Sequence, residues 1–205
     1  NKEAIKSFKQ AIRIDPDDAG VHALLGLTYY LSGKYKEAIE SYKQAIRINP
    51  DSAVAHCGLG RAYNKLGKYE EAIESYKQAI RIDPDFAWGH YNLGKAYGDL
   101  EKYKEAIKSY KQAIRIHPDY ALTHEVVKMA HNNLGVVYRK LGRNKEAINS
   151  LKQALRIDPD YKSAHFNLGL AYLQLNDKSS ALEQYKILKK LDTKKANELF
   201  DLIYE

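Results

Sequence analysis

Histidines are the side chains of this sequence whose type and spacing could do chemistry. A histidine stands six residues after each of the five prolines. A row of this kind could bind a transition metal or supply a catalytic base. The five positions are His22, His56, His90, His124 and His165.

A shared metal site does not fit the distances expected between these histidines. Equivalent residues on stacked helix pairs lie about 10 Å apart, whereas zinc holds its nitrogen ligands at about 2.1 Å. His124 and His131 share a helix face, but seven residues separate them by about 10.5 Å along the axis. We therefore expect the histidines to have a packing role, and we predict no metal, no other cofactor and no catalytic residue. Metal binding and a His/Ser/Asp or Cys/His nucleophile are the alternatives.

The prolines mark an internal repeat that decides which elements carry the histidines. They are spaced by 34, 34, 34 and 41 residues, and each ends a copy of the segment YKEAIESYKQAIRINP found at residues 35–50. Apolar residues recur in it every three or four positions, which is the period of an amphipathic helix. A second helix is expected after each proline, where Asp and Ser are good N-cap residues. Glycine recurs inside this helix, which indicates that a neighbouring helix comes close.

These residues resemble the tetratricopeptide repeat, a 34-residue helix–turn–helix unit. Residues 19–52, 53–86 and 87–120 show its order of Leu-Gly, Tyr, Gly, Ala, an aromatic residue, Ala and Pro. Histidine takes the place of the usual tryptophan in the first helix. The resemblance implies an all-α fold, a right-handed superhelical solenoid of antiparallel helix pairs. It also implies that the first helices line a concave groove that holds a partner peptide.

We expect one continuous array over residues 1–193, closed by a capping helix at residues 194–205. In the capping helix, Ala196, Leu199, Leu202 and Ile203 should face inward. Because the chain begins inside a repeat, we expect it to be part of a longer protein. The predicted units are a half repeat at 1–18 and repeats at 19–52, 53–86, 87–120, 121–161 and 162–193.

The unit at residues 121–161 contains a seven-residue insertion. Seven residues are two turns and keep the helical phase within about 20°, so we expect a first helix lengthened by about 10 Å. Val126, Val127 and Met129 should then not all find cover, and exposed apolar residues would mark a contact site at the lip of the groove. A surface loop is the alternative.

The groove is predicted from the positions at which the units differ. Asparagine stands at Asn92, Asn133 and Asn167 in three successive units. This series resembles the asparagine ladder by which some tetratricopeptide proteins hold a peptide backbone, and an amide can both donate and accept. The alternative is that asparagine is simply tolerated at these positions and has no binding role. The other predicted peptide-binding residues are Arg61, Lys65, Lys95, Trp88, Tyr91 and Arg139.

The charge and composition narrow the class of partner. The formal net charge is +7, and much of it comes from a repeated Lys/Arg pair on the second helices. We expect a solvated outer face there, with an acidic or nucleic-acid surface as the alternative partner. The single Cys57 cannot form an intrachain disulfide, and no run of 18 apolar residues predicts a membrane span.

The sequence thus predicts a protein–protein interaction scaffold that is not itself an enzyme. Its expected partner is a protein or peptide with acidic groups, without a membrane or nucleic-acid role, and a cytoplasmic location is favoured. One alternative is the targeting or substrate-presenting part of a larger enzyme. Another is self-assembly, through the N-terminal half repeat or through the inserted residues 121–131.

Overall fold

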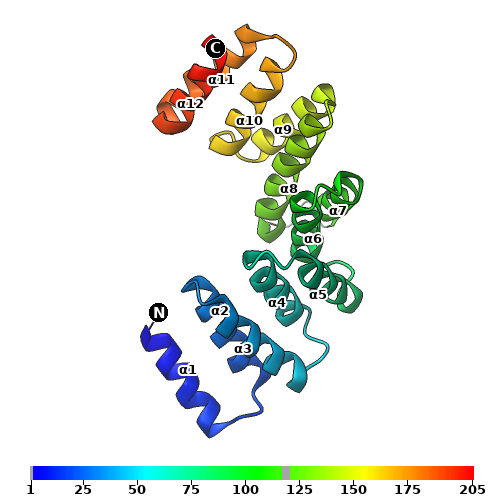
Figure 1. Cartoon of the computed structure of the whole chain (residues 1–205), viewed down its shortest axis with the longest axis vertical. Coiled ribbons are helices and arrows are strands. Elements are labelled where there is room, and N and C mark those ends of the chain that lie inside the picture. Colours follow the sequence, from blue (N-terminus) through cyan, green and yellow to red (C-terminus); the bar gives the residue numbers. More distant parts are fainter. Residues whose placement is uncertain (1, 117–120) are drawn as a thin grey trace. The chain divides into compact units, whose positions relative to one another are not determined.

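The computed structural model describes residues 2–116 and 121–205, and all regular structure in these ranges is helical. The all-α array of antiparallel helix pairs predicted from the sequence is confirmed (Figure 1). Pro118 lies outside the described residues. The chain forms two compact units, residues 1–102 and residues 103–205, which are described separately.

Unit 1 holds three of the near-identical amphipathic helices and three helices that follow the turns between them. The six are α1 (Lys2–Ile14), α2 (Ala19–Leu31), α3 (Tyr35–Ile48), α4 (Ala53–Lys65), α5 (Tyr69–Ile82) and α6 (Ala87–Asp99). Unit 2 continues the same alternation and ends on one additional helix. Its helices are α7 (Tyr103–Arg115), α8 (Ala121–Lys140), α9 (Asn144–Ile157), α10 (Lys162–Leu173), α11 (Lys178–Leu191) and α12 (Thr193–Tyr204).

Alternate helices within each unit form two rows. In unit 1, α2 contacts α4 and α4 contacts α6, and in unit 2, α8 contacts α10; we call these helices the inner row. The helices between them, which we call the outer row, are α1, α3 and α5 in unit 1 and α7, α9 and α11 in unit 2. Within either unit, no two outer-row helices contact each other among the described residues. Grooves can therefore open between neighbouring outer helices.

Glycine allows the two rows to pack closely. A Cβ atom added at Gly58 would lie 2.4 Å from Cζ of Tyr42, and one added at Gly60 would lie 2.7 Å from Cε1 of Tyr76. Both tyrosine rings are buried. The close approach predicted from the repeated glycines is therefore confirmed, and it sets the depth of the inter-helix packing.

The turns from inner to outer helices share one left-handed residue. This residue is Gly33, Gly67 or Gly142 in three turns, with φ near 70°. Glycine has no Cβ to clash in this conformation. At the two other turns, Glu101 and Asn176 take the same conformation with φ of 57° and 58°.

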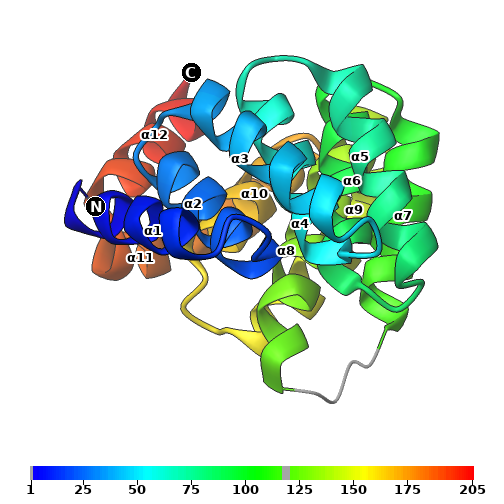
Figure 2. The same ribbon diagram turned by 90° about the horizontal axis from the view of Figure 1, so that it is seen from below.

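Helix α8 carries the insertion as one unbroken helix of 20 residues, so the lengthened helix is confirmed and the loop alternative is wrong. The expected exposure is wrong for Val126 and Val127, which are only 0% and 4% exposed, whereas Met129 is half-buried. The reason is that the added turns pack beside the turn from α9 to α10 (Figure 2). There Lys128 Nζ lies 2.7 Å from Glu125 and 3.0 Å from Asp158.

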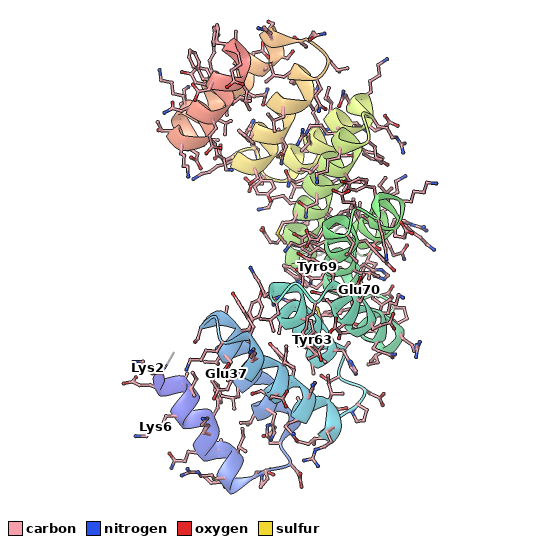
Figure 3. The ribbon with its side chains drawn as sticks, in the orientation of Figure 1. Lys2, Lys6, Glu37, Tyr63, Tyr69 and Glu70 are labelled. Carbon is pink, nitrogen blue, oxygen red and sulfur yellow. The ribbon has the colours of Figure 1, made fainter. Side chains whose placement is uncertain are left out.

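The two terminal helices are covered to different extents. Ile5, Phe8 and Ile12 of α1 pack against the core beside α2, yet α1 has no buried residue. Lys2 and Lys6 project from its side away from α2 (Figure 3). At the other end, α12 buries Ala196, Leu199 and Ile203, as predicted, but Leu202 is exposed. Leu202 comes directly before the buried Ile203, and neighbouring residues on a helix point about 100° apart.

Candidate functional site

The inner row of unit 1 brings four predicted site residues together. Arg61 and Lys65 come from α4, and Asn92 and Lys95 come from the next inner helix, α6. All four line one shallow cavity of about 30 Å³. Tyr30, Asn64 and Tyr76 complete its lining.

Arg61 is held in place by an aromatic ring. Its guanidinium carbon lies 4.5 Å from the ring centre of Tyr30, a cation–π arrangement. In the part of the chain that the structure describes, no carboxylate is within salt-bridge distance of Arg61, Lys65 or Lys95. The cavity edge therefore carries three cations without an internal counter-ion, an arrangement suited to an anionic group.

Asn92 is less available than the sequence suggests. It is buried, and its amide nitrogen donates to the Trp88 carbonyl at 2.8 Å and to the sulfur of Cys57 at 3.6 Å. Trp88 and Tyr91 lie on the same helix and form an edge-to-face pair with ring centres 5.9 Å apart. Trp88 remains exposed. The amide nitrogen of Asn92 is thus used in hydrogen bonds within α6 and from α6 to α4.

The remaining predicted residues belong to unit 2. Asn167 Nδ2 donates to Asn132 Oδ1 at 3.0 Å, and Asn132 Nδ2 donates to Asn133 Oδ1 at 3.0 Å. Asn133 and Asn167 are therefore joined through the buried Asn132. Arg139 is half-buried, its Nε has no hydrogen-bond partner, and burial lowers the pKa of its guanidinium.

Two residues of these clusters, Tyr30 and Asn132, are not predicted from the sequence pattern. Tyr30 was overlooked because most tyrosines recur with the repeat and form its framework. Its own equivalents, 34 residues apart, are Asn64 and Gly98, so the missing periodicity could have revealed it. Asn132 directly precedes Asn133, but only the contact from α10 shows that it links the two predicted asparagines.

The histidine row has the packing role predicted for it. A proline carbonyl can only accept a hydrogen bond. In four repeats, the histidine Nε2–H group therefore donates to the carbonyl oxygen of the proline six residues earlier. The distances are 3.0 Å for His22, His56 and His90 and 2.7 Å for His165. These bonds tie α2, α4, α6 and α10 to the turns that precede them.

The paired cations of the outer row are solvated, as expected. Lys43 and Lys77 are exposed and lie 3.6 Å and 2.9 Å from Glu40 and Glu74, one turn earlier on the same helix. Exposed pairs of this kind contribute little to stability.

Comparison with family profiles identifies the chain. Profiles described as "TPR repeat" match residues 1–33, 28–67, 60–101 and 135–176. Profiles described as "Tetratricopeptide repeat" match residues 87–120 and 163–194. The chain therefore belongs to the tetratricopeptide repeat family, whose repeats serve as protein-interaction scaffolds. No curated protein matches the sequence.

Solved structures share the fold over most of the chain. A crystal structure of MamA is 27% identical, with a TM-score of 0.71, over 84% of this chain and 97% of its own. TTC0263 from Thermus thermophilus, a thermophilic TPR protein, is also 27% identical, with a TM-score of 0.70, over 91% of this chain and 100% of its own. YrrB, described as a TPR protein with an unusual peptide-binding site, is 21% identical, with a TM-score of 0.69, over 96% and 99%.

Across the helices that the structure describes, none combines the length and the apolar character needed to cross a membrane.

Proposed function

We propose that this chain is a non-catalytic scaffold whose inner row binds a peptide or protein segment with acidic side chains. In unit 1, a ligand carboxylate would lie between Arg61, Lys65 and Lys95. The exposed Trp88 beside Tyr91 would supply an apolar contact. In unit 2, Asn133, Asn167 and Arg139 would contact the backbone of a segment bound to that unit.

The observation that carries this proposal is Arg61 on the ring of Tyr30. An arginine side chain loses conformational freedom on binding, and a guanidinium already fixed by stacking loses less. Its planar edge can hold a carboxylate through two hydrogen bonds. Lys65 and Lys95 add charge at the same cavity edge without carboxylates of their own. MamA and TTC0263 support the scaffold class, and the peptide-binding site reported for YrrB supports the kind of ligand.

Peptides selected from a random displayed library on immobilised protein would supply the ligand for the test. We expect the selected peptides to be rich in Asp and Glu. Arg61→Gln should weaken their binding about tenfold in calorimetry, because a hydrogen bond to a charged group contributes about 1.5 kcal/mol or more. Tyr30→Leu should weaken it about threefold by releasing Arg61.

The matched control is Arg47→Gln, which removes an exposed arginine from the outer-row helix α3. It should leave the affinity unchanged. Equal losses in Arg47→Gln and Arg61→Gln would contradict a specific inner-row site, and so would selected peptides without acidic residues.

A further inference from the structure

An open groove lies between outer-row helices in each unit. The groove between α1 and α3 measures about 570 Å³, and the groove between α7 and α9 about 410 Å³. Their linings correspond position by position along the repeat. Leu25 and Tyr29 of α2 line the first, and Leu134 and Tyr138 of α8 line the second. Glu37 of the first groove is labelled in Figure 3.

The insertion changes the histidine of the second groove. His131 takes the repeat position of His22, but Pro118 precedes it by 13 residues instead of six. The residue six positions before it is Glu125, whose carbonyl lies within α8 and is used by the helix itself. His131 therefore cannot make the hydrogen bond to a proline carbonyl that His22, His56, His90 and His165 make. Its Nδ1 is buried without a hydrogen-bond partner at the lining of the groove.

Burial lowers the pKa of His131, so its ring is neutral at pH 7. A neutral imidazole offers one N–H donor and one acceptor. A buried polar atom without a partner costs about 1–3 kcal/mol. A turn of the ring that brings Nδ1 to the groove, where a ligand can bond it, would remove that cost.

The charges of the second groove favour an anion. Lys111 and Arg115 of α7 line it, and among the described residues neither has a carboxylate within salt-bridge distance. The acidic residue of its lining, Glu146, is bound by Arg143 at 2.7 Å. Asn149 takes the repeat position at which Glu40 lines the first groove. The second groove thus lacks a negative charge that the first one carries, while the first is lined by a further cation, Lys36.

We propose that the groove between α7 and α9 is a second binding site, for an extended acidic segment of a partner protein in which a carboxylate adjoins an aliphatic side chain. The carboxylate accepts hydrogen bonds from Lys111 and Arg115. The aliphatic side chain covers Ile114, Leu134 and Tyr138, and the ligand backbone bonds the ring of His131. This site is on the outer row of unit 2, and its existence does not depend on the inner-row site of unit 1.

The test uses the full chain and a fluorescein-labelled peptide of alternating aspartate and leucine whose termini are blocked. We expect saturable binding by fluorescence anisotropy and a shift of the His131 ring nitrogen signals in ¹⁵N NMR spectra. Lys111→Glu and Asn149→Glu should each weaken binding about fivefold, since each places a carboxylate at the groove. Both positions are exposed, so the fold should be retained.

Lys9→Glu is the matched control, because Lys9 takes the place of Lys111 in the first groove. It should leave the affinity unchanged. Equal losses for Lys9→Glu and Lys111→Glu would overturn the proposal by showing unspecific attraction. It would also be overturned by no binding, by tighter binding of a lysine–leucine peptide, or by light scattering that shows a dimer dissociated by Lys111→Glu. Loss of binding in Arg61→Gln alone would assign the peptide to the inner row.

Discussion

The Nε2–H group of His165 donates to the carbonyl oxygen of Pro159 across 2.7 Å, while its Nδ1 lies 2.8 Å from Oε1 of Gln184. The proline carbonyl fixes the proton on Nε2. In the neutral ring Nδ1 accepts, which requires the Gln184 amide to be turned so that its NH₂ group replaces Oε1 at this contact. Both ring nitrogens are then used inside the array. His165 thus shows the full packing role of this repeat position. At His131, the insertion removes the hydrogen bond to a proline carbonyl, and Nδ1 has no partner.

His90→Phe should lower the free energy of unfolding by about 1 kcal/mol, because it deletes the bond to the Pro84 carbonyl. His131→Phe is the matched variant and should be neutral or stabilising, because it replaces a buried unbonded nitrogen with carbon. Urea unfolding followed by circular dichroism measures both. A loss for His131→Phe as large as that for His90→Phe would contradict the assigned difference between the two histidines.

Lys128→Ala should loosen the added turns of α8, since Lys128 joins them to Asp158 at the end of α9. We expect a loss of about 1 kcal/mol and faster amide exchange over residues 121–130, measured by hydrogen–deuterium exchange. Lys128 is only 12% exposed at its side chain, so the loss should exceed that of an ordinary surface pair. Lys145→Ala, at an exposed site on α9, is the control and should change neither quantity.

The protein should lose stability in alkali. Burial raises the pKa of Cys57 from 9.0 to about 11, against the opposing charge of Arg61, and raises that of Tyr42 from 10.0 to about 12. Above about pH 9 the unfolded chain loses these protons while the folded chain keeps them, so the free energy of unfolding falls as pH rises to about 12. Cys57→Ala should reduce the fall by about 2–3 kcal/mol. An unchanged pH profile for this variant in urea titrations would contradict the role of the thiol.

Lys128 should add to the same alkaline loss. Burial lowers its pKa, but its hydrogen bonds to Glu125 and Asp158 outweigh burial and leave the pKa above the ordinary 10.5. Its contribution is present below that pH and is lost as the pH rises through the folded pKa. Lys128→Ala should therefore flatten the pH profile above about pH 10.5, which the same titrations would detect.

Helix α1 should exchange its amide protons faster than α3, although the two sequences are nearly the same. Ala38, Ile39, Tyr42 and Ala45 are buried in α3, whereas no residue of α1 is buried. In addition, Ile14 is 81% exposed. Fewer buried contacts lower the free energy of local opening. Equal protection of α1 and α3 in the monomer would refute this prediction, and protection that appears only in an oligomer would show that another chain covers α1.

Glu101→Gly should stabilise unit 1 by about 0.5–1 kcal/mol, because Glu101 takes a left-handed conformation that three other turns give to glycine. Thermal unfolding of the variant measures the effect. Gly67→Glu is the converse change at the equivalent turn, and it should destabilise the unit by a similar amount. Opposite signs for the two variants are the expected result; destabilisation by both would show that the Glu101 side chain contributes more than its backbone conformation costs.

The sequence alone determined the helix pairs and their order, because a 34-residue period fixes the amphipathic phase of every unit at once. The same phase argument correctly predicted that seven extra residues would lengthen α8 without a break. The repeat pattern also identified Arg61, Lys65, Asn92 and Lys95 as neighbours, since they occupy related positions on successive inner helices.

Only the tertiary structure decided which side chains remain available to a ligand. Periodicity gives the direction of a residue on its own helix, but burial and bonding depend on what other helices place opposite it. Val126 and Val127 are therefore covered where exposure was expected, and the amide nitrogen of Asn92 is bonded to Trp88 and Cys57. For the same reason, the ring of Tyr30 beneath Arg61 and the unbonded Nδ1 of His131 emerge from contacts between helices that the repeat pattern does not encode.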